Sequence, residues 1–419
     1  MKRIVFSTVG SLGDLHPYIA IGKELQERGH RAVIATTDRY RAIIQAEGIE
    51  YAPLRPAEAQ FGGLEAVAAR LFDPYRGPGY LIREMVMPYV RDQYEDIASA
   101  CRSADVLVTH PLTMAGPLVC AKTGLPWVSS ILAPASLMSA IDRPLLNSAL
   151  WARALRNMGA MTYGIVTKAA ELVARRWESP LHALRSELGL PRAPHAALLQ
   201  GQFSPRLNLA LFPRLLAEPQ SDWPANTVLT GFARFDGAST DPHLRQAFEA
   251  FLAAGEPPIV FALGSSVVMI AGDFWEKAIE ASQQLGRRAI LLTGTPLRQA
   301  LPTSVRAFDY LPYSIVFAKA AAIVHQGGIG TLAQALAAAR PQLIVPVAFD
   351  QPDNARRAAN LGVARSIPIR KVTVAKMAGA LEELLAEPSY AANTAKAADG
   401  LEGGARRAAD ALLGSQPIV

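Results

Sequence analysis

The chain has 419 residues, of which 50% are apolar and 19% are charged, a composition typical of a globular protein with two or three domains. It excludes a mostly disordered chain and a low-complexity fibre, and the two cysteines exclude a disulfide scaffold and a four-cysteine zinc site. The net charge of +6 comes from 42 Lys and Arg against 36 Asp and Glu spread along the chain, so we expect no nucleic-acid partner.

The first part of the chain alternates strands with helices. Arg3–Thr8 is expected to be a buried strand, residues 10–16 a loop, and Pro17 the first turn of a helix that stops at Gly29. Further strands are expected at 31–36, 49–54, 105–109 and 127–131, with a helix capped by Asp38 between the first two. The apolar runs at the N-terminus and at 258–271 are too short for a secretory leader or a bilayer span, so we expect a cytoplasmic protein.

The segment Leu145–Trp177 interrupts this alternation with a long helical stretch. It combines apolar residues at helical spacing with bases that include Lys168, Arg175 and Arg176. One interpretation is an amphipathic helix packed on its domain. The alternative is an apolar acceptor pocket with a basic rim, or a peripheral membrane-surface face.

The strand and helix pattern restarts in the second half. Strands are expected at 259–263, 289–293, 320–325 and 342–347, with helices at 274–284, 330–339 and 351–361. We expect an α/β protein with two doubly wound, Rossmann-like domains facing a cleft. The N-terminal domain spans 1–222 and the C-terminal domain 236–390, joined by a proline-rich linker at 213–235. Residues 391–419 are expected to form a helical tail that packs back towards the N-terminal domain.

A glycine-rich turn follows the strand that ends at His325. It holds Gly327, Gly328 and Gly330, then Thr331 and a helix, whose N-terminal N–H groups suit a phosphate or diphosphate. The next strand is followed by Asp350 and Gln351. Because parallel strands deliver their C-terminal loops to one edge of the sheet, the two segments should lie close together. A phosphate site beside a carboxylate and an amide suits a nucleotide-sugar.

The segment from His325 to Gln351, HQGGIGT followed by ARPQLIVPVAFDQ, resembles the donor-binding motif of the GT-B inverting glycosyltransferases of the UDP-glycosyltransferase-like superfamily. The resemblance extends over the whole chain, including the N-terminal GSLGD loop. Bacterial rhamnosyltransferases, macrolide and glycopeptide glycosyltransferases and sterol glucosyltransferases look most similar. It implies a hexosyltransferase that needs no cofactor and uses UDP-glucose, dTDP-rhamnose or dTDP-glucose as co-substrate.

The resemblance also implies roles for the donor residues. His325 would contact the diphosphate, the backbone around Gly327, Gly328, Gly330 and Thr331 would cradle it, and Asp350 and Gln351 would hold the sugar hydroxyls. Leu311 lies where relatives clamp the base, Ser265 would add a phosphate contact, and Ser11 and Gly13 count among the donor contacts. Many relatives carry a ribose-binding glutamate where this chain has Ala333, so uridine and thymidine both remain open.

The loop after the first strand carries the catalytic candidates. Asp14 stands where plant and animal relatives place a catalytic histidine, and it would accept the proton of the attacking acceptor hydroxyl. Its alternative role is to cap the following helix, and His16 is a rival base. Since no Asp-x-Asp motif is present, we expect no divalent metal. The acceptor is expected to be a hydrophobic small molecule or lipid. A nucleotide-sugar 2-epimerase of the same fold and a non-catalytic auxiliary homologue are the alternative functions.

Overall fold

A computed structural model describes residues 1–419 except 63, 148–149, 238–240, 298–299 and 415–419. The chain divides into two compact units. The first comprises Met1–Pro144, Ala149–Phe235 and Gly403–Val419, and the second Leu145–Ser148 and Asp236–Glu402.

The first unit is built on a parallel sheet. Within its described residues the strand order is β3-β2-β1-β4-β5-β6-β7. The strands are β1 Arg3–Ser7, β2 Arg31–Thr36, β3 Glu50–Pro53, β4 Val106–Thr109, β5 Trp127–Ile131, β6 Asn208–Ala210 and β7 Thr227–Leu229. The helices are α1 Leu12–Glu27, α2 Arg41–Ala46, α3 Leu64–Leu71, α4 Gly77–Tyr80, α5 Val90–Ala100, α6 Gly116–Thr123, α7 Leu150–Asn157, α8 Ala160–Trp177, α9 Ser179–Glu187 and α18 Gly404–Leu413.

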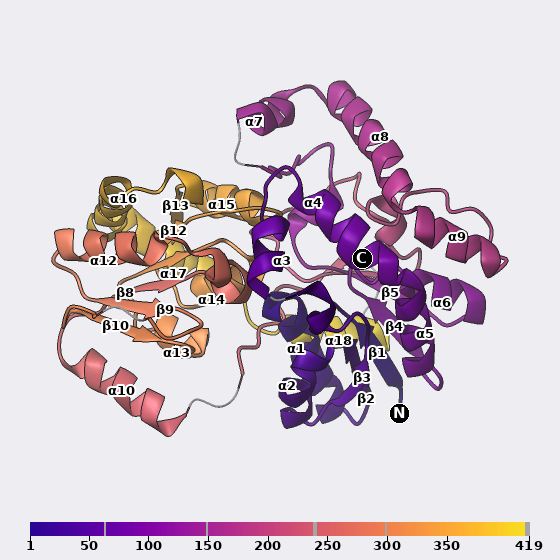
Figure 1. The fold of residues 1–419 in the computed structure, drawn as a ribbon, viewed down its shortest axis with the longest axis horizontal. Helices are drawn as coiled ribbons and strands as arrows, with labels where there is room; N and C mark the ends of the chain where they lie inside the picture. The colour runs from indigo at the N-terminus through magenta and orange to yellow at the C-terminus, as the bar shows by residue number, and fades with distance from the viewer. Residues whose placement is uncertain (63, 148–149, 238–240, 298–299, 415–419) are drawn as a thin grey trace. The chain divides into compact units, whose positions relative to one another are not determined.

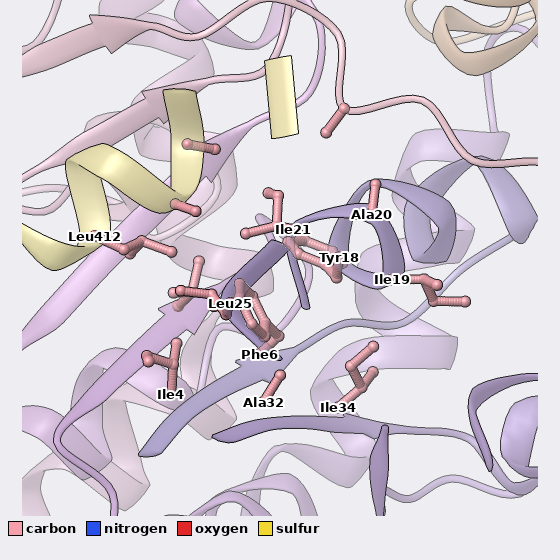
Figure 2. Packing of buried hydrophobic residues seen from close by; sticks show 14 of the residues in the cluster. Ile4, Phe6, Tyr18, Ile19, Ala20, Ile21, Leu25, Ala32, Ile34 and Leu412 are labelled. Carbon is pink, nitrogen blue, oxygen red and sulfur yellow. The ribbon is translucent and has the colours of Figure 1, made fainter. Parts of the chain in front are cut away.

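Successive side chains of β1 pack into two hydrophobic cores on opposite faces of this sheet, because side chains alternate between the two faces of a strand. Ile4 and Phe6 pack with α1 on one face, and α18 completes the same cluster through Leu412, as Figure 2 shows. Val5 packs on the other face with side chains of α5 and α6. The expected doubly wound arrangement is therefore present in the first unit.

The second unit repeats the arrangement with a parallel sheet in the order β10-β9-β8-β11-β12-β13. Its strands are β8 Ile259–Ala262, β9 Ala289–Leu292, β10 Val305–Phe308, β11 Ala322–His325, β12 Gln342–Ile344 and β13 Ala364–Ser366. Its helices are α10 Pro242–Ala253, α11 Gly264–Val267, α12 Phe274–Gln284, α13 Tyr313–Phe317, α14 Ile329–Ala337, α15 Gln351–Asn360, α16 Val374–Ala386 and α17 Pro388–Ala398 (Figure 1). Among the described residues, no helix reaches the length and apolarity needed to cross a membrane.

The structure corrects two expected boundaries. The stretch 213–235 is not a separate linker, because β7 lies within it and pairs with β6 in the first sheet. Its three prolines, Pro213, Pro219 and Pro224, all precede this short strand and do not mark a connection between domains. The tail is also divided: α17 belongs to the second unit, and α18 packs on α1 of the first.

Candidate functional site

Both sheets have a topological switch point, where the chain turns from one direction of winding to the other. In the first unit it lies between β1 and β4, and in the second between β8 and β11. Ligands of doubly wound folds bind outside the C-terminal ends of the strands at such points. The sequence-predicted residues Asp14 and Ser265 follow β1 and β8, and His325 is the last residue of β11.

Asp14 lies in the first turn of α1, not in a loop as expected. Ser11 caps the helix, and its backbone N–H and Oγ both donate to Asp14 Oδ2, at 2.7 and 2.9 Å. This reciprocal capping box starts the helix five residues before Pro17. Gly10 makes the arrangement possible, since a Cβ there would lie 2.4 Å from Asp14 Oδ2. The capping role considered for Asp14 is therefore real, and it also fixes the carboxylate in place.

His110 is the partner of Asp14 that the sequence analysis missed. It follows β4, across the switch point, and its Nε2 lies 3.2 Å from Asp14 Oδ1. The other ring nitrogen, Nδ1, accepts a hydrogen bond from the Leu112 N–H at 3.1 Å. Because Nδ1 is an acceptor, the proton of the neutral ring sits on Nε2 and is donated to the carboxylate. The His110 side chain is 5% exposed and that of Asp14 is 31% exposed, so Asp14 is the member of the pair that a substrate can reach.

The environment keeps Asp14 ionised. Burial raises the pKa of its carboxyl, but hydrogen bonds from His110 and Ser11 stabilise the charged form and outweigh that effect, so the pKa lies below its usual value. A carboxylate that is charged at neutral pH and partly accessible can accept a proton from a substrate hydroxyl.

The other N-terminal candidates, His16, Ser11 and Gly13, make contacts within the first unit. His16 is two residues further along α1, where helical geometry turns it to a different side, and its ring packs edge-on against Phe235 with centroids 5.2 Å apart. Ser11 holds Asp14, and its Oγ also accepts from the Gly13 N–H at 3.2 Å. Among the interactions described, those of Ser11 and Gly13 stabilise the start of the helix.

His325 is fully buried at the end of β11. Its Nδ1 accepts from the Gly327 N–H at 3.1 Å, and its Nε2 lies 3.0 Å from Gln342 Oε1. Burial lowers the pKa of this histidine to about 4, so the ring is neutral at pH 7. A neutral, buried histidine differs from a cationic residue that binds phosphate. In the structure, His325 stabilises the glycine turn through its hydrogen bond with the Gly327 N–H.

The glycine turn is closely packed around Gln326. Gly327 has φ +87°, and a Cβ there would lie 2.7 Å from Ile344 Cγ2. A Cβ on Gly264, after β8, would lie 2.2 Å from Gln326 Nε2, which also donates to Thr331 Oγ1 at 3.3 Å. The two loops at the switch point of the second unit therefore approach one another closely at Gln326.

The start of α14 offers backbone donors beside this turn. Gly328 is the N-cap, and the first helical bond runs from the Leu332 N–H to the Gly328 carbonyl. N–H groups before Leu332, including those of Gly330 and Thr331, therefore have no intrahelical carbonyl partner. The turn and helix start form a fitting cradle for an anion.

Asp350 and Gln351 lie at the start of α15, next to the glycine turn. Asn354 joins the two segments, since its Nδ2 donates to the Gly327 carbonyl at 2.9 Å and to Asp350 Oδ2 at 2.7 Å. Gln351 Oε1 accepts from the Val347 N–H at 2.9 Å, which leaves the amide group of Gln351 buried against the loop. The structure thus brings His325, the glycines, Asp350 and Gln351 together as expected.

Two buried amide oxygens in this neighbourhood lack a hydrogen-bond partner within the described part of the chain. They are Gln326 Oε1 and Asn354 Oδ1. A buried polar atom without a partner is unfavourable unless solvent or a ligand supplies the donor. Both side chains were missed by the sequence analysis, although Gln326 follows His325 directly and Asn354 follows Asp350 by one helical turn.

The remaining donor candidates are placed differently. The Leu311 side chain is 1% exposed and belongs to the core, so only its backbone can take part in binding a base. The neighbouring Tyr310 ring is 44% exposed, and its hydroxyl donates to the Asp236 carbonyl at 2.6 Å. Ser265 lies in α11, half-buried, beside Gly264. Burial raises the pKa of Tyr313, whose hydroxyl interacts with Thr331 and with the backbone of Gly264.

Comparison with known proteins agrees with this architecture. Residues 4–78 match the glycosyltransferase family 28 N-terminal domain, and residues 289–404 match the erythromycin biosynthesis protein CIII-like C-terminal domain. The chain is 30% identical over 402 residues to O-mycaminosyltylonolide 6-deoxyallosyltransferase of Streptomyces fradiae, covering 93% of this chain and 91% of that protein. It is 28% identical over 419 residues to glycosyltransferase GtfC of Amycolatopsis orientalis, covering 98% and 97%.

Solved structures show the same fold. The spinosyn rhamnosyltransferase SpnG, solved in complex with thymidine diphosphate, has a TM-score of 0.67 at 18% identity, covering 99% of this chain and 100% of that one. The two parallel α/β sheets are those of the GT-B fold, which confirms the expected fold class. The chain belongs to the UDP-glycosyltransferase-like superfamily and is a glycosyltransferase.

Proposed function

We propose that this protein transfers a hexose, with inversion, from a UDP- or dTDP-sugar to a hydroxyl of a hydrophobic small-molecule or lipid acceptor. The observation that carries the proposal is the Asp14 carboxylate, held ionised by His110 and Ser11 at a switch point and still partly exposed. Asp14 is the general base, and His110 is a positioning residue. The two cysteines are free, which fits a reducing compartment, and we place the reaction in the cytoplasm.

In the proposed reaction the acceptor oxygen attacks the anomeric carbon while its proton passes to Asp14. The bond between that carbon and the diphosphate oxygen breaks, and the nucleoside diphosphate leaves with the electron pair. The N–H groups at the start of α14 stabilise the charge on the leaving group. Since His325 is neutral and engaged on both sides, its role is to hold the glycine turn in the shape that presents these donors.

Asp350 and Gln351 are proposed to hold the sugar hydroxyls, with Asn354 fixing the position of Asp350. Gln326 Oε1 and Asn354 Oδ1, which have no donor among the residues that the structure describes, suit a ligand rich in hydroxyl groups. The exposed ring of Tyr310 is a better candidate than Leu311 for contact with the base. The thymidine diphosphate in the SpnG structure supports a nucleotide-sugar donor, and the macrolide-type name of the S. fradiae relative supports an apolar acceptor.

The proposal is tested with Asp14→Asn, which keeps the shape of the side chain and removes its basicity. Loss of a general base lowers kcat by about 10²–10⁴-fold. Because Asp14 lies outside the second unit, the dissociation constant for UDP or dTDP should stay unchanged. Asp38→Asn, at an exposed position of the same unit, is the matched control. Wild-type turnover by Asp14→Asn would refute the assignment.

Two further measurements separate the alternatives. Release of nucleoside diphosphate only when an acceptor is present supports transfer, whereas a change in the donor sugar without an acceptor indicates a 2-epimerase. A protein that binds donor and never turns over would be a non-catalytic homologue. We propose that no divalent metal is needed, and complete loss of transfer in EDTA that is restored by Mg²⁺ would contradict this.

A further inference from the structure

Exposed apolar side chains concentrate on α8 and the residues just before it. Of the large hydrophobic side chains that are exposed in the described residues, five lie on α8: Met161, Ile165, Val166, Leu172 and Val173. Met161 is 83% exposed, Leu172 66% and Ile165 64%. Isolated exposed hydrophobics are ordinary, but a contiguous group on one element marks an interaction site.

Helical geometry places these side chains on one face. At 100° per residue, Met161, Ile165 and Leu172 fall within about 40° of each other, and Val173 and Val166 extend the same face. Tyr163 and Ala174, on the other side of the helix, are buried against the first unit. The helix is thus amphipathic, but unlike a typical surface helix its apolar face points away from the protein. It lies between α7 and α9 along the chain (Figure 1).

The charges on α8 are distributed unevenly. Lys168 and Arg176 are exposed on the apolar face or at its edge. The two carboxylates of this region are turned inward: Glu171 pairs with Arg175 and accepts from the Ala196 N–H, and buried Glu178 accepts from the N–H groups of Ala197 and Leu198. Within the described residues of α8, the exposed face therefore carries positive charge and no exposed carboxylate.

We propose that this face of α8 docks on an anionic lipid bilayer surface. The aliphatic side chains enter the boundary between headgroups and acyl chains, and Lys168 and Arg176 contact lipid phosphates. The contact is peripheral, because the opposite face of the helix is packed on the protein.

Two features favour a bilayer over another protein. The exposed side chains are aliphatic groups and a methionine, without the Trp and Tyr that anchor protein interfaces, and a fluid acyl region accommodates such groups without shape complementarity. A second copy is disfavoured by Lys168, which lies near the middle of the helix. Two antiparallel α8 helices related by a two-fold axis would bring their Lys168 ammonium groups together.

The test is flotation of the full chain with vesicles of phosphatidylcholine alone and of phosphatidylcholine with phosphatidylglycerol. The wild-type chain is expected to float with the anionic vesicles. Ile165→Ser with Leu172→Ser should lower the partition coefficient roughly tenfold or more. Lys168→Gln with Arg176→Gln should lower it about fivefold for each charge removed, and the loss should shrink in high salt. Ile43→Ser, an exposed apolar residue of α2, is the control and should float like the wild type.

Three outcomes would overturn the proposal. One is absence of flotation with anionic vesicles. A second is flotation that the α8 substitutions do not change. The third is a dimer, measured by light scattering, that becomes a monomer in Ile165→Ser with Leu172→Ser, because the face would then belong to a second copy. All substituted positions are exposed, so circular dichroism and thermal melting should show unchanged folding, and this checks that the lost binding is local.

Discussion

Replacing His110 by Asn tests whether this histidine acts through the charge of Asp14. The Asn oxygen takes the place of Nδ1 and keeps the bond from the Leu112 N–H, while the bond from Nε2 to Asp14 Oδ1 is lost. A hydrogen bond to a charged group is worth about 1.5–3 kcal/mol, and one pKa unit corresponds to about 1.4 kcal/mol. Since the lost donor stabilised the ionised form, the pKa of Asp14 should rise by about one to two units.

The assay is the pH dependence of kcat/KM with saturating donor. In the wild type, the acid limb that belongs to Asp14 should lie below the range of an ordinary aspartate, because the hydrogen bonds from His110 and Ser11 hold the pKa of this carboxyl below its usual value. In His110→Asn the limb should move upward by about one to two pH units, and activity should partly recover on its alkaline side. His110→Gln is the matched variant, since its amide N–H reaches the position of Nε2, and it should return the limb towards that of the wild type.

One result would refute this reasoning. If His110→Asn lowers kcat/KM equally at every pH and leaves the acid limb in place, His110 does not influence the charge of Asp14. The histidine would then be a packing residue, or a catalytic group in its own right. Dissociation constants for UDP and dTDP serve as the internal control, because the proposed donor cradle lies in the second unit and should not respond.

The remaining predictions concern Gly10 in the first unit and the glycine turn with His325 in the second. Gly327→Ala combines an unfavourable φ of +87° with a Cβ 2.7 Å from Ile344 Cγ2, so the glycine turn should be distorted. We expect at least tenfold weaker nucleotide binding, measured by calorimetry. Unchanged binding would contradict the proposal that this turn binds the diphosphate. Gly10→Ala should lower kcat and spare nucleotide affinity, because the new Cβ displaces the Asp14 carboxylate. His325 has a folded pKa of about 4 against about 6.5 when unfolded, so its contribution to stability is present above pH 6.5 and is lost as the pH falls towards 4. Urea unfolding should show a loss of roughly 3 kcal/mol over that range, absent in His325→Asn.

The sequence was informative where one strong local pattern decided the structure. The buried strands β1, β2, β5 and β8 and the helix α12 were predicted within a residue or two, because apolar runs bounded by glycine or charge have few alternatives. The strands β10 and β13 were not predicted, since each contains an arginine and exposed positions and therefore lacks the continuous apolar run of the buried strands. The start of α1 was wrong because Pro17 was given more weight than the Ser11–Asp14 capping box.

The site shows the same division. Motif spacing alone brought His325 and Asp350 to one edge of the sheet, because parallel topology fixes that much. Motif spacing could not show that both ring nitrogens of His325 are hydrogen-bonded within the protein. These bonds, with the Gly327 N–H and with Gln342, depend on how the side chains pack. His110 could have been found, because it directly follows the strand predicted at 105–109, and that strand lies next to β1 in the sheet.

The return of the chain to the first unit has a practical consequence for domain exchange. Ala408, Ala409 and Leu412 of α18 are buried in the same core as Leu25 of α1, and Arg28 pairs with Asp410. A truncated chain that ends near Phe235 would expose that apolar face of α1 and invite aggregation. A chimera that combines the first unit of this chain with the second unit of a relative should therefore exchange residues 236–402 and keep its own last helix, so that the transplanted segment is an insertion with two junctions.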